Sequence, residues 1–157
     1  MKPYIGISEV NRKKVIAALG ELLANEIALT QATRGAHWNV VGPNFGPLHA
    51  LFGEQYDALN DQVDEIAERI RTLGGTPATR LAAFAKAATI DDSAGDEATA
   101  QKMLASLLKG HEAIVVGLRS GAIEVAGKAD DKGTEDFLVG MMEAHEKTAW
   151  VLRAHLG

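Results

Sequence analysis

Residues 36 to 75, AHWNVVGPNFGPLHALFGEQYDALNDQVDEIAERIRTLGG, decide the fold expected of this chain. The stretch opens at the end of one helical pattern, breaks at Gly42-Pro43, and resumes as a second helical pattern from about Pro47 to Leu73. Glycine directly after the last helical residue is a frequent helix stop, and Gly74-Gly75 supplies one. The sequence therefore predicts a helical hairpin with a short turn between its two arms.

Besides this second helix, the sequence indicates three further helical segments. The first helix begins near Ser8, a residue type that favours the N-cap position. Apolar residues at helical spacing predict a third helix from about Gly95-Asp96 to Ala126 and a fourth from about Asp131 to His155. Together these segments predict an all-α protein, a four-helix bundle with a single domain spanning residues 1–157.

A long connection separates the second and third helices, from about Gly74 to Ala94. A bundle whose second and third helices run parallel needs such a crossover. The stretch Pro77 to Ala88 has the composition of a short helix lying across the bundle. The expected architecture is therefore a four-helix bundle with a short helix in its crossover.

Composition excludes several classes of function. The chain has no cysteine, which excludes disulfides, zinc–thiolate sites and thiol catalysis. A formal net charge of -5 disfavours nucleic-acid binding by simple electrostatics and is compatible with cations as partners. The N-terminal residues lack the apolar core of a signal peptide, and no apolar run approaches the roughly 20 residues of a membrane helix. We expect a cytoplasmic protein with no membrane partner.

Histidines and carboxylates in the hairpin are the candidates for chemistry. His37 lies near the end of the first helix and His49 near the start of the second, so the short turn lets their imidazoles approach. Four acidic residues then follow on the second helix at spacings of 4, 3 and 4, which places them on one face: Asp57, Asp61, Asp64 and Glu68. Fe²⁺ accepts a mixed shell of carboxylate and imidazole ligands, so the sequence indicates iron chemistry.

Helix geometry constrains how such a site could be assembled. His49 and Asp64 are 15 positions apart on one helix, which corresponds to roughly 22 Å along its axis. One metal ion cannot be bound by both residues of the same chain. A site made of His37, His49, Asp64 and Glu68 needs the carboxylates of an antiparallel partner, as a two-fold dimer provides. This hypothesis predicts an obligate homo-oligomer.

Residues 36 to 75 resemble the signature region of the Dps family, the ferritin-like DNA-binding proteins from starved cells. The resemblance rests on His-Trp-Asn at 37–39, a second histidine twelve residues on, and Asp-Glu-Ile-Ala-Glu-Arg at 64–69. It extends more weakly over the whole chain, including Glu-Asp-Phe-Leu at 135–138 and the helix that carries Trp150.

The resemblance implies a ferritin-like bundle with a specific metal site. His37 and His49 correspond to the family's histidine ligands, Asp64 and Glu68 to its carboxylate ligands from the adjoining subunit, and Trp38 to a tryptophan beside the metal. The implied function is iron storage and detoxification in a hollow dodecamer built from two-fold dimers. Such a ferroxidase oxidises Fe²⁺ to Fe³⁺, preferably with hydrogen peroxide, and stores ferric mineral inside.

One departure from the family concerns the ligands. The family has an acidic residue four positions after the second histidine, where this chain has Gly53. Glu54 is a poor substitute, because one residue turns a helical side chain by about 100°. We expect ferroxidase activity that is slower or more dependent on peroxide, at a mono-iron or di-iron site. The alternative is a helical shell with a degenerate metal site.

A second departure concerns DNA, which family members often bind through a basic tail. Lys2 is the only basic residue before Ser8, and no basic tail follows the fourth helix. The next basic residues, Arg12, Lys13 and Lys14, fall in the first helical turns. Direct DNA binding is therefore not expected, which disfavours the alternative of a nucleoid-associated DNA-protecting protein.

An acidic group marks the start of the fourth helix: Asp130, Asp131, Glu135 and Asp136. Acidic residues there complement the helix dipole. By the resemblance, the same region lines three-fold pores through which iron enters, and rings of carboxylates would concentrate cations. Both interpretations stay open for these four residues.

The remaining histidines and the tryptophans receive structural interpretations. His111, His145 and His155 have no acidic partner at helical spacing, so we predict surface or interface positions. Trp38 and Trp150 are predicted to be packing residues. The sequence also predicts that methionines fill the core or an interface: Met103, Met141 and Met142.

Overall fold

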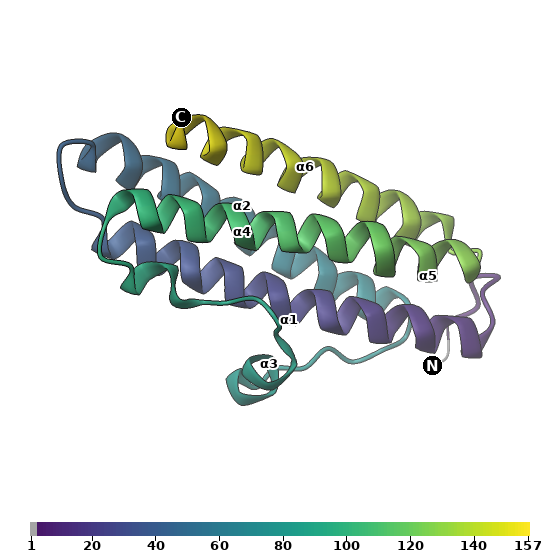
Figure 1. Ribbon diagram of the computed structural model, residues 1–157. Coiled ribbons are helices and arrows are strands. Elements are labelled where there is room, and N and C mark those ends of the chain that lie inside the picture. The colour runs from purple at the N-terminus through teal and green to yellow at the C-terminus, as the bar shows by residue number, and fades with distance from the viewer. Residues whose placement is uncertain (1–2) are drawn as a thin grey trace.

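The computed structural model describes residues 3–157, and every regular element in that range is helical (Figure 1). The long helices are α1 (Glu9–Asn39), α2 (Phe45–Thr72), α4 (Ala100–Gly117) and α6 (Lys132–Leu156). The third arm continues beyond α4 through a π-helical turn, η2 (Leu118–Ala122), into α5 (Ile123–Lys128). The predicted all-α four-helix bundle is confirmed, whereas the π turn was not predicted.

The crossover between the second and third arms follows the predicted plan. In Figure 1, α2 and α4 run in the same direction, and the connection passes along the outside of α1. It carries the short helix α3 (Leu81–Ala87) and the 3₁₀ turn η1 (Ser93–Asp96). α3 is shorter than predicted, because the backbone at Arg80 is still extended (φ -99°, ψ 130°).

Side-chain caps explain where α1 and α4 begin. Ser8 caps α1 as predicted, accepting a hydrogen bond from the backbone N–H of Asn11 at 3.2 Å. The third arm starts at Ala100 rather than near Gly95-Asp96, because Thr99 accepts from the N–H of Lys102 and sets the N-cap there. The cap formed by Thr99 therefore sets the start of α4 later in the sequence than we predicted.

α2 ends at the predicted glycine pair. Gly74 has a left-handed backbone (φ +87°), which glycine adopts without the steric cost of a Cβ. The N–H of Gly75 donates back to the carbonyl of Ile70 at 2.9 Å, satisfying an otherwise free helix-end acceptor. The chain then turns into the crossover.

The core is a continuous apolar layer shared by all four arms, with α1 packed on α2 and α4 packed on α6. Leu19, Phe52, Leu107 and Leu152 are each fully buried and come from four different helices. α1 is long and apolar enough to cross a membrane by length and composition alone, but 56% of that window is buried inside the bundle. A central helix of a bundle has the same composition, so this property does not indicate a membrane span.

The end of the crossover makes a close backbone contact with α1. A Cβ on Gly95 would lie 2.6 Å from the backbone of Gly35, so a side chain at position 95 would force one of the two backbones to shift. The Asn39 side-chain amide donates to the carbonyl of Gly95 at 2.8 Å. The asparagine of the His-Trp-Asn motif thus holds η1 against the last turns of α1.

A buried ion pair ties the end of α2 to the start of α6. Asp131 is 2% exposed and accepts from Arg69 Nη2 at 2.8 Å, from the Thr134 N–H at 3.0 Å and from Thr134 Oγ1 at 2.6 Å. Arg69 Nε also donates to Thr134 Oγ1 at 2.8 Å. The carboxylate of Asp131 is therefore both an N-cap and a partner for a charge on a neighbouring helix.

We predict that Asp131→Ala lowers the free energy of unfolding by about 3 kcal/mol, because it removes the cap and leaves Arg69 without its buried partner. Urea denaturation at a fixed protein concentration measures this change. Asp136→Ala, which removes an exposed carboxylate from the second turn of α6, is the control and should change stability by less than about 0.5 kcal/mol. Equal effects of the two substitutions would contradict the role assigned to Asp131.

Candidate functional site

The two predicted histidines meet where α1 ends and α2 begins. His37 lies in the last turn of α1 and His49 in the first turns of α2, joined by a connection of five residues, 40–44. Their rings stack with centroids 3.7 Å apart and planes inclined by 21°. The structure therefore brings His37 and His49 together, as predicted from the short turn.

Each of these histidines is fixed by the backbone of the other. His37 Nδ1 lies 2.6 Å from the carbonyl oxygen of His49, and His49 Nδ1 lies 2.8 Å from the carbonyl oxygen of His37. A carbonyl only accepts, so both Nδ1 atoms carry the proton and donate. In a neutral imidazole the other nitrogen, Nε2, then has a free lone pair. Histidine ligands of metals are oriented in this way by a hydrogen bond from their second nitrogen.

Tyr56 and Arg34 complete the environment of His37 and were not predicted from the sequence. The Tyr56 ring meets that of His37 edge-on, with centroids 5.2 Å apart. The Arg34 guanidinium lies 5.1 Å from the centre of the Tyr56 ring and donates to the Asn60 side chain at 3.3 Å. The signal was present in the sequence, because residues 49, 53, 56 and 60 follow the spacing of one helical face.

Gly53 lies directly beneath the His37 ring on this same face of α2. A Cβ at this position would be 3.3 Å from His37 Cε1 and 3.4 Å from His37 Nδ1. These separations are tight but not prohibitive, so a side chain at 53 would press on the imidazole. Position 53 therefore has no carboxylate, and the His37 ring packs closely against its backbone.

The four acidic residues of the α2 face are all exposed in the single subunit: Asp57, Asp61, Asp64 and Glu68. Among residues 3–157, no group of three or more histidine, aspartate or glutamate side chains could hold a metal ion within one subunit. Arg71, three positions after Glu68, donates to the Gly75 carbonyl and to Thr76.

Large apolar side chains surround the histidines and face outward. Trp38 is 63% exposed, Val41 72% and Phe45 48%, and Phe45 stacks on His49 with ring centroids 5.1 Å apart. Trp150 is 62% exposed. Trp38 and Trp150, which we predicted to be packing residues, are both largely exposed in the single subunit, so any packing role would need another subunit.

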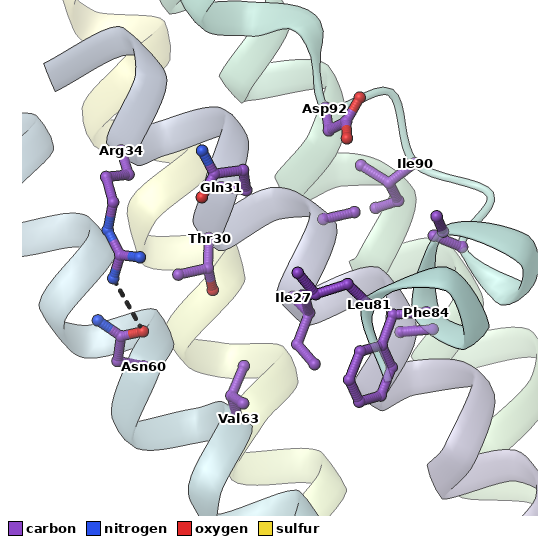
Figure 2. A pocket seen from close by; sticks show the side chains of 14 residues that line it. Ile27, Thr30, Gln31, Arg34, Asn60, Val63, Leu81, Phe84, Ile90 and Asp92 are labelled. Atoms are coloured by element: carbon purple, nitrogen blue, oxygen red, sulfur yellow. Dashed lines mark hydrogen bonds between the residues drawn. The ribbon is translucent and has the colours of Figure 1, made fainter. Parts of the chain in front are cut away.

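An open pocket of about 580 Å³ lies beside this surface, between α1, α2 and the short helix α3. Figure 2 shows Arg34 and Asn60, joined by their hydrogen bond, at one side of it and Phe84 of α3 at another. Leu81 is 80% exposed at its rim. Arg34 lines this pocket and also lies over the Tyr56 ring, which contacts His37, so these two side chains connect the pocket with the histidine pair.

The four acidic residues around the start of α6 have different environments. Asp130 and Asp136 are exposed, and Asp130 has a left-handed backbone (φ 55°). Glu135 pairs with Lys132 at 2.7 Å, and this contact raises the pKa of the Lys132 ammonium above its usual value. Asp131 is buried against Arg69. A pore role for these residues stays a prediction, with Asp130 and Asp136 the carboxylates that face outward.

The prediction that His111 and His145 lie at the surface is wrong. They are 2% and 1% exposed, and His145 has an acidic partner, Glu26, which is 0% exposed on α1. Sequence spacing could not show this pairing, because the partner comes from a different helix. Of these three histidines only His155 is exposed, as predicted. Met103 and Met141 are buried, as predicted.

Comparisons with known proteins agree with this architecture. A family model described as a ferritin-like domain matches residues 16–157. An uncharacterized low temperature-induced protein of Nostoc sp. is 41% identical over 152 residues, which cover 97% of this chain and 85% of that protein. DNA protection during starvation protein 2 of Bacillus anthracis is 38% identical over 92% of this chain and 97% of its own.

Solved structures give the same result. The crystal structure of a Dps protein from Vibrio cholerae O1 matches with a TM-score of 0.93 and 34% identity, covering 100% of this chain and 98% of that one. A Dps protein from Bacillus brevis matches with a TM-score of 0.90 at 34% identity, covering 96% of this chain and 100% of that one. The predicted resemblance is confirmed, and the chain belongs to the Dps family of ferritin-like proteins.

Proposed function

We propose that this protein stores and detoxifies iron, oxidising Fe²⁺ to Fe³⁺ at sites shared between subunits of a hollow, cytoplasmic dodecamer. The observation that carries the proposal is the pair of reciprocal hydrogen bonds between His37 and His49. Both imidazoles are held with Nδ1 protonated and Nε2 free to bind a cation. The Vibrio relative is described as a member of the ferritin-like diiron-carboxylate proteins, which supports iron as the substrate.

Carboxylates are the second half of the proposed site. Asp64 and Glu68 are exposed on one face of α2 and are too far along that helix to reach the histidines of their own chain. A partner with an antiparallel α2 would bring them to His37 and His49, and the outward apolar residues around the histidines would be buried in the same contact. Two identical sites would result in each dimer.

The proposed residues divide the chemistry between binding and charge control. The imidazoles bind Fe²⁺ as neutral ligands, and the carboxylates offset the additional positive charge when it becomes Fe³⁺. Hydrogen peroxide, the oxidant that we favour, takes up two electrons and two protons to give two molecules of water. Because each Fe²⁺ supplies one electron, two ions are oxidised for each peroxide.

Complementation between two inactive variants tests the shared site. We expect His37→Ala and Asp64→Ala each to abolish saturable Fe²⁺ oxidation, because each removes a ligand from both sites of a dimer. Co-expression should restore activity, since a mixed dimer has one doubly damaged site and one intact site. With random pairing, roughly one quarter of the sites would be intact. Stopped-flow absorbance of ferric product, with and without peroxide, measures the restored fraction.

The exposed Asp57 provides the control for this experiment, because it lies on the same acidic face but outside the proposed ligand set. Asp57→Ala should oxidise iron like the wild-type protein. Activity that stays absent in co-expressed mixed oligomers, verified by native mass spectrometry, would show that the histidines and Asp64 do not share a site.

Gly53 limits the number of ions that each site can bind. Its position next to His37 is where the family supplies a further carboxylate, and no side chain is present there to hold a second ion. We infer that one Fe²⁺ binds firmly at each site and that a second binds weakly or through water. This inference accounts for the slower or more peroxide-dependent oxidation that we expect.

Substitution at Gly53 tests this limit. Gly53→Asp should raise the tightly bound Fe²⁺ from about one to about two per site, because it adds a hard oxygen ligand. Anaerobic calorimetric titration gives the stoichiometry. Gly53→Ala is the matched control, since its Cβ makes the same tight contact with His37 without a carboxylate. An identical stoichiometry in both variants would contradict the inference.

DNA protection is the alternative function, and the names of the Bacillus anthracis and Brevibacillus brevis relatives refer to it. This chain has a net charge of -5, and Arg12 and Lys13 lie within helix α1, where Lys13 pairs with Glu9. We predict no retarded DNA band in a gel-shift assay at low salt and micromolar protein. A band that disappears as salt is raised would instead indicate electrostatic DNA binding.

A further inference from the structure

Three ionisable side chains lie together in the middle of the bundle, away from the candidate iron site. Glu26 of α1 is 0% exposed, His111 of α4 is 2% exposed and His145 of α6 is 1% exposed. They supply four of the five buried side-chain nitrogen and oxygen atoms that lack a hydrogen-bond partner within residues 3–157. A concentration of such atoms in one place of an apolar core requires an explanation.

The three side chains form a line rather than a ring. Nδ1 of His111 lies 2.9 Å from Nδ1 of His145, within hydrogen-bond distance. On the other side of His145, its Nε2 lies 2.9 Å from Glu26 Oε1, at ion-pair distance but off the direction in which an N–H donates. The order is therefore Glu26, His145, His111, with His145 in contact with both neighbours.

This order fixes where protons are favourable. Without a proton on His145 Nε2, that nitrogen and the Glu26 carboxylate would present lone pairs to each other at 2.9 Å in a medium of low dielectric. A proton between His145 Nε2 and Glu26 Oε1 removes this repulsion, whichever of the two groups carries it, and leaves the cluster without net charge. The two Nδ1 atoms then share one proton, which one imidazole donates and the other accepts.

A second proton, on His111, has no counterion to stabilise it. Apart from Glu26, His111 and His145, no charged or titratable side chain of α4 or of the elements packed against it (α1, α6, η1 and η2) is buried. Two cationic imidazoles 2.9 Å apart would also repel each other.

We propose that Glu26, His145 and His111 form an acid-sensitive switch in the bundle core, which accepts one proton within the ion pair and is destabilised by the next. At neutral pH the ion pair joins α1 to α6 and the neutral His111 completes the contact with α4. Acidification forces a second positive charge into the core and opens the bundle. The switch is independent of the proposed iron site.

The pKa of His111 determines whether acid stabilises or destabilises the folded chain, and over which pH range. Burial, and next the charge of His145, lower the pKa of His111 from 6.5 to about 3 in the folded chain. The unfolded chain therefore binds this proton first as pH falls. The stabilisation is complete above pH 6.5 and is lost progressively down to about pH 3, with the unfolding constant rising on the order of tenfold per pH unit.

Thermal unfolding of the full-length protein at several pH values, in the presence of EDTA, tests the switch. Between pH 6.5 and 4, the Tm of the wild-type protein should fall by roughly 10 °C more than that of His111→Gln or His111→Leu. His155→Gln, which removes an exposed histidine, is the control and should keep the wild-type slope. Two substitutions at 111 are used because either could perturb packing, and the slope reports protonation independently of the Tm at neutral pH.

Two outcomes would contradict the switch. Equal pH slopes in the wild-type protein and both His111 variants would overturn the proposal. It would also be overturned if Zn²⁺, added to a His37→Ala/His49→Ala background, raised Tm only when His111 is present, because the cluster would then be a metal site.

Discussion

The exchange of hydrogen bonds between His37 and His49 is the constraint on which the candidate site depends. Each imidazole donates to the backbone carbonyl of the other residue, so the turn between α1 and α2 and the two side chains are fixed together. An imidazole on a loose turn would sample several rotamers and either tautomer. Here the hairpin's own backbone selects both, and the selected form leaves the metal-binding nitrogen of each ring free. The bond from His49 also satisfies the carbonyl of His37, which is one of the last four carbonyls of α1 and has no acceptor role within that helix.

Buried polar groups at the end of the bundle differ from those in its middle in how completely they are hydrogen-bonded. At the end of α2, Asp131 combines an N-cap with an ion pair to the partly exposed Arg69, and its hydrogen-bonding capacity is used. In the middle, Glu26, His145 and His111 are excluded from water and leave several atoms without partners. The first arrangement is fully hydrogen-bonded, whereas the second depends on a particular number of protons.

Local sequence patterns predicted the fold, but they did not predict contacts between helices that are distant in the sequence. Ser8 and Gly74-Gly75 were recognisable as helix signals because cap chemistry depends on a few adjacent residues. His37 and His49 were recognisable because a short turn forces them together. Glu26 and His145 lie more than a hundred positions apart, and nothing in the spacing of either helix indicates the other. The outward position of Trp38 was also missed, since an aromatic residue at helical spacing does not reveal whether its partner is the same chain or another.

The contact between Gly35 and Gly95 divides the crossover into two parts, which differ in how well they tolerate inserted or deleted residues. Because the two backbones touch and Asn39 holds the carbonyl of Gly95, the chain from η1 onward is anchored to α1. Upstream, the extended residues before α3 are mostly exposed and make no comparable backbone contact. Added or deleted residues near Thr76 can therefore be absorbed by the path of the loop, at a small entropic cost. The same change near Gly95 would displace η1 and the start of α4 together.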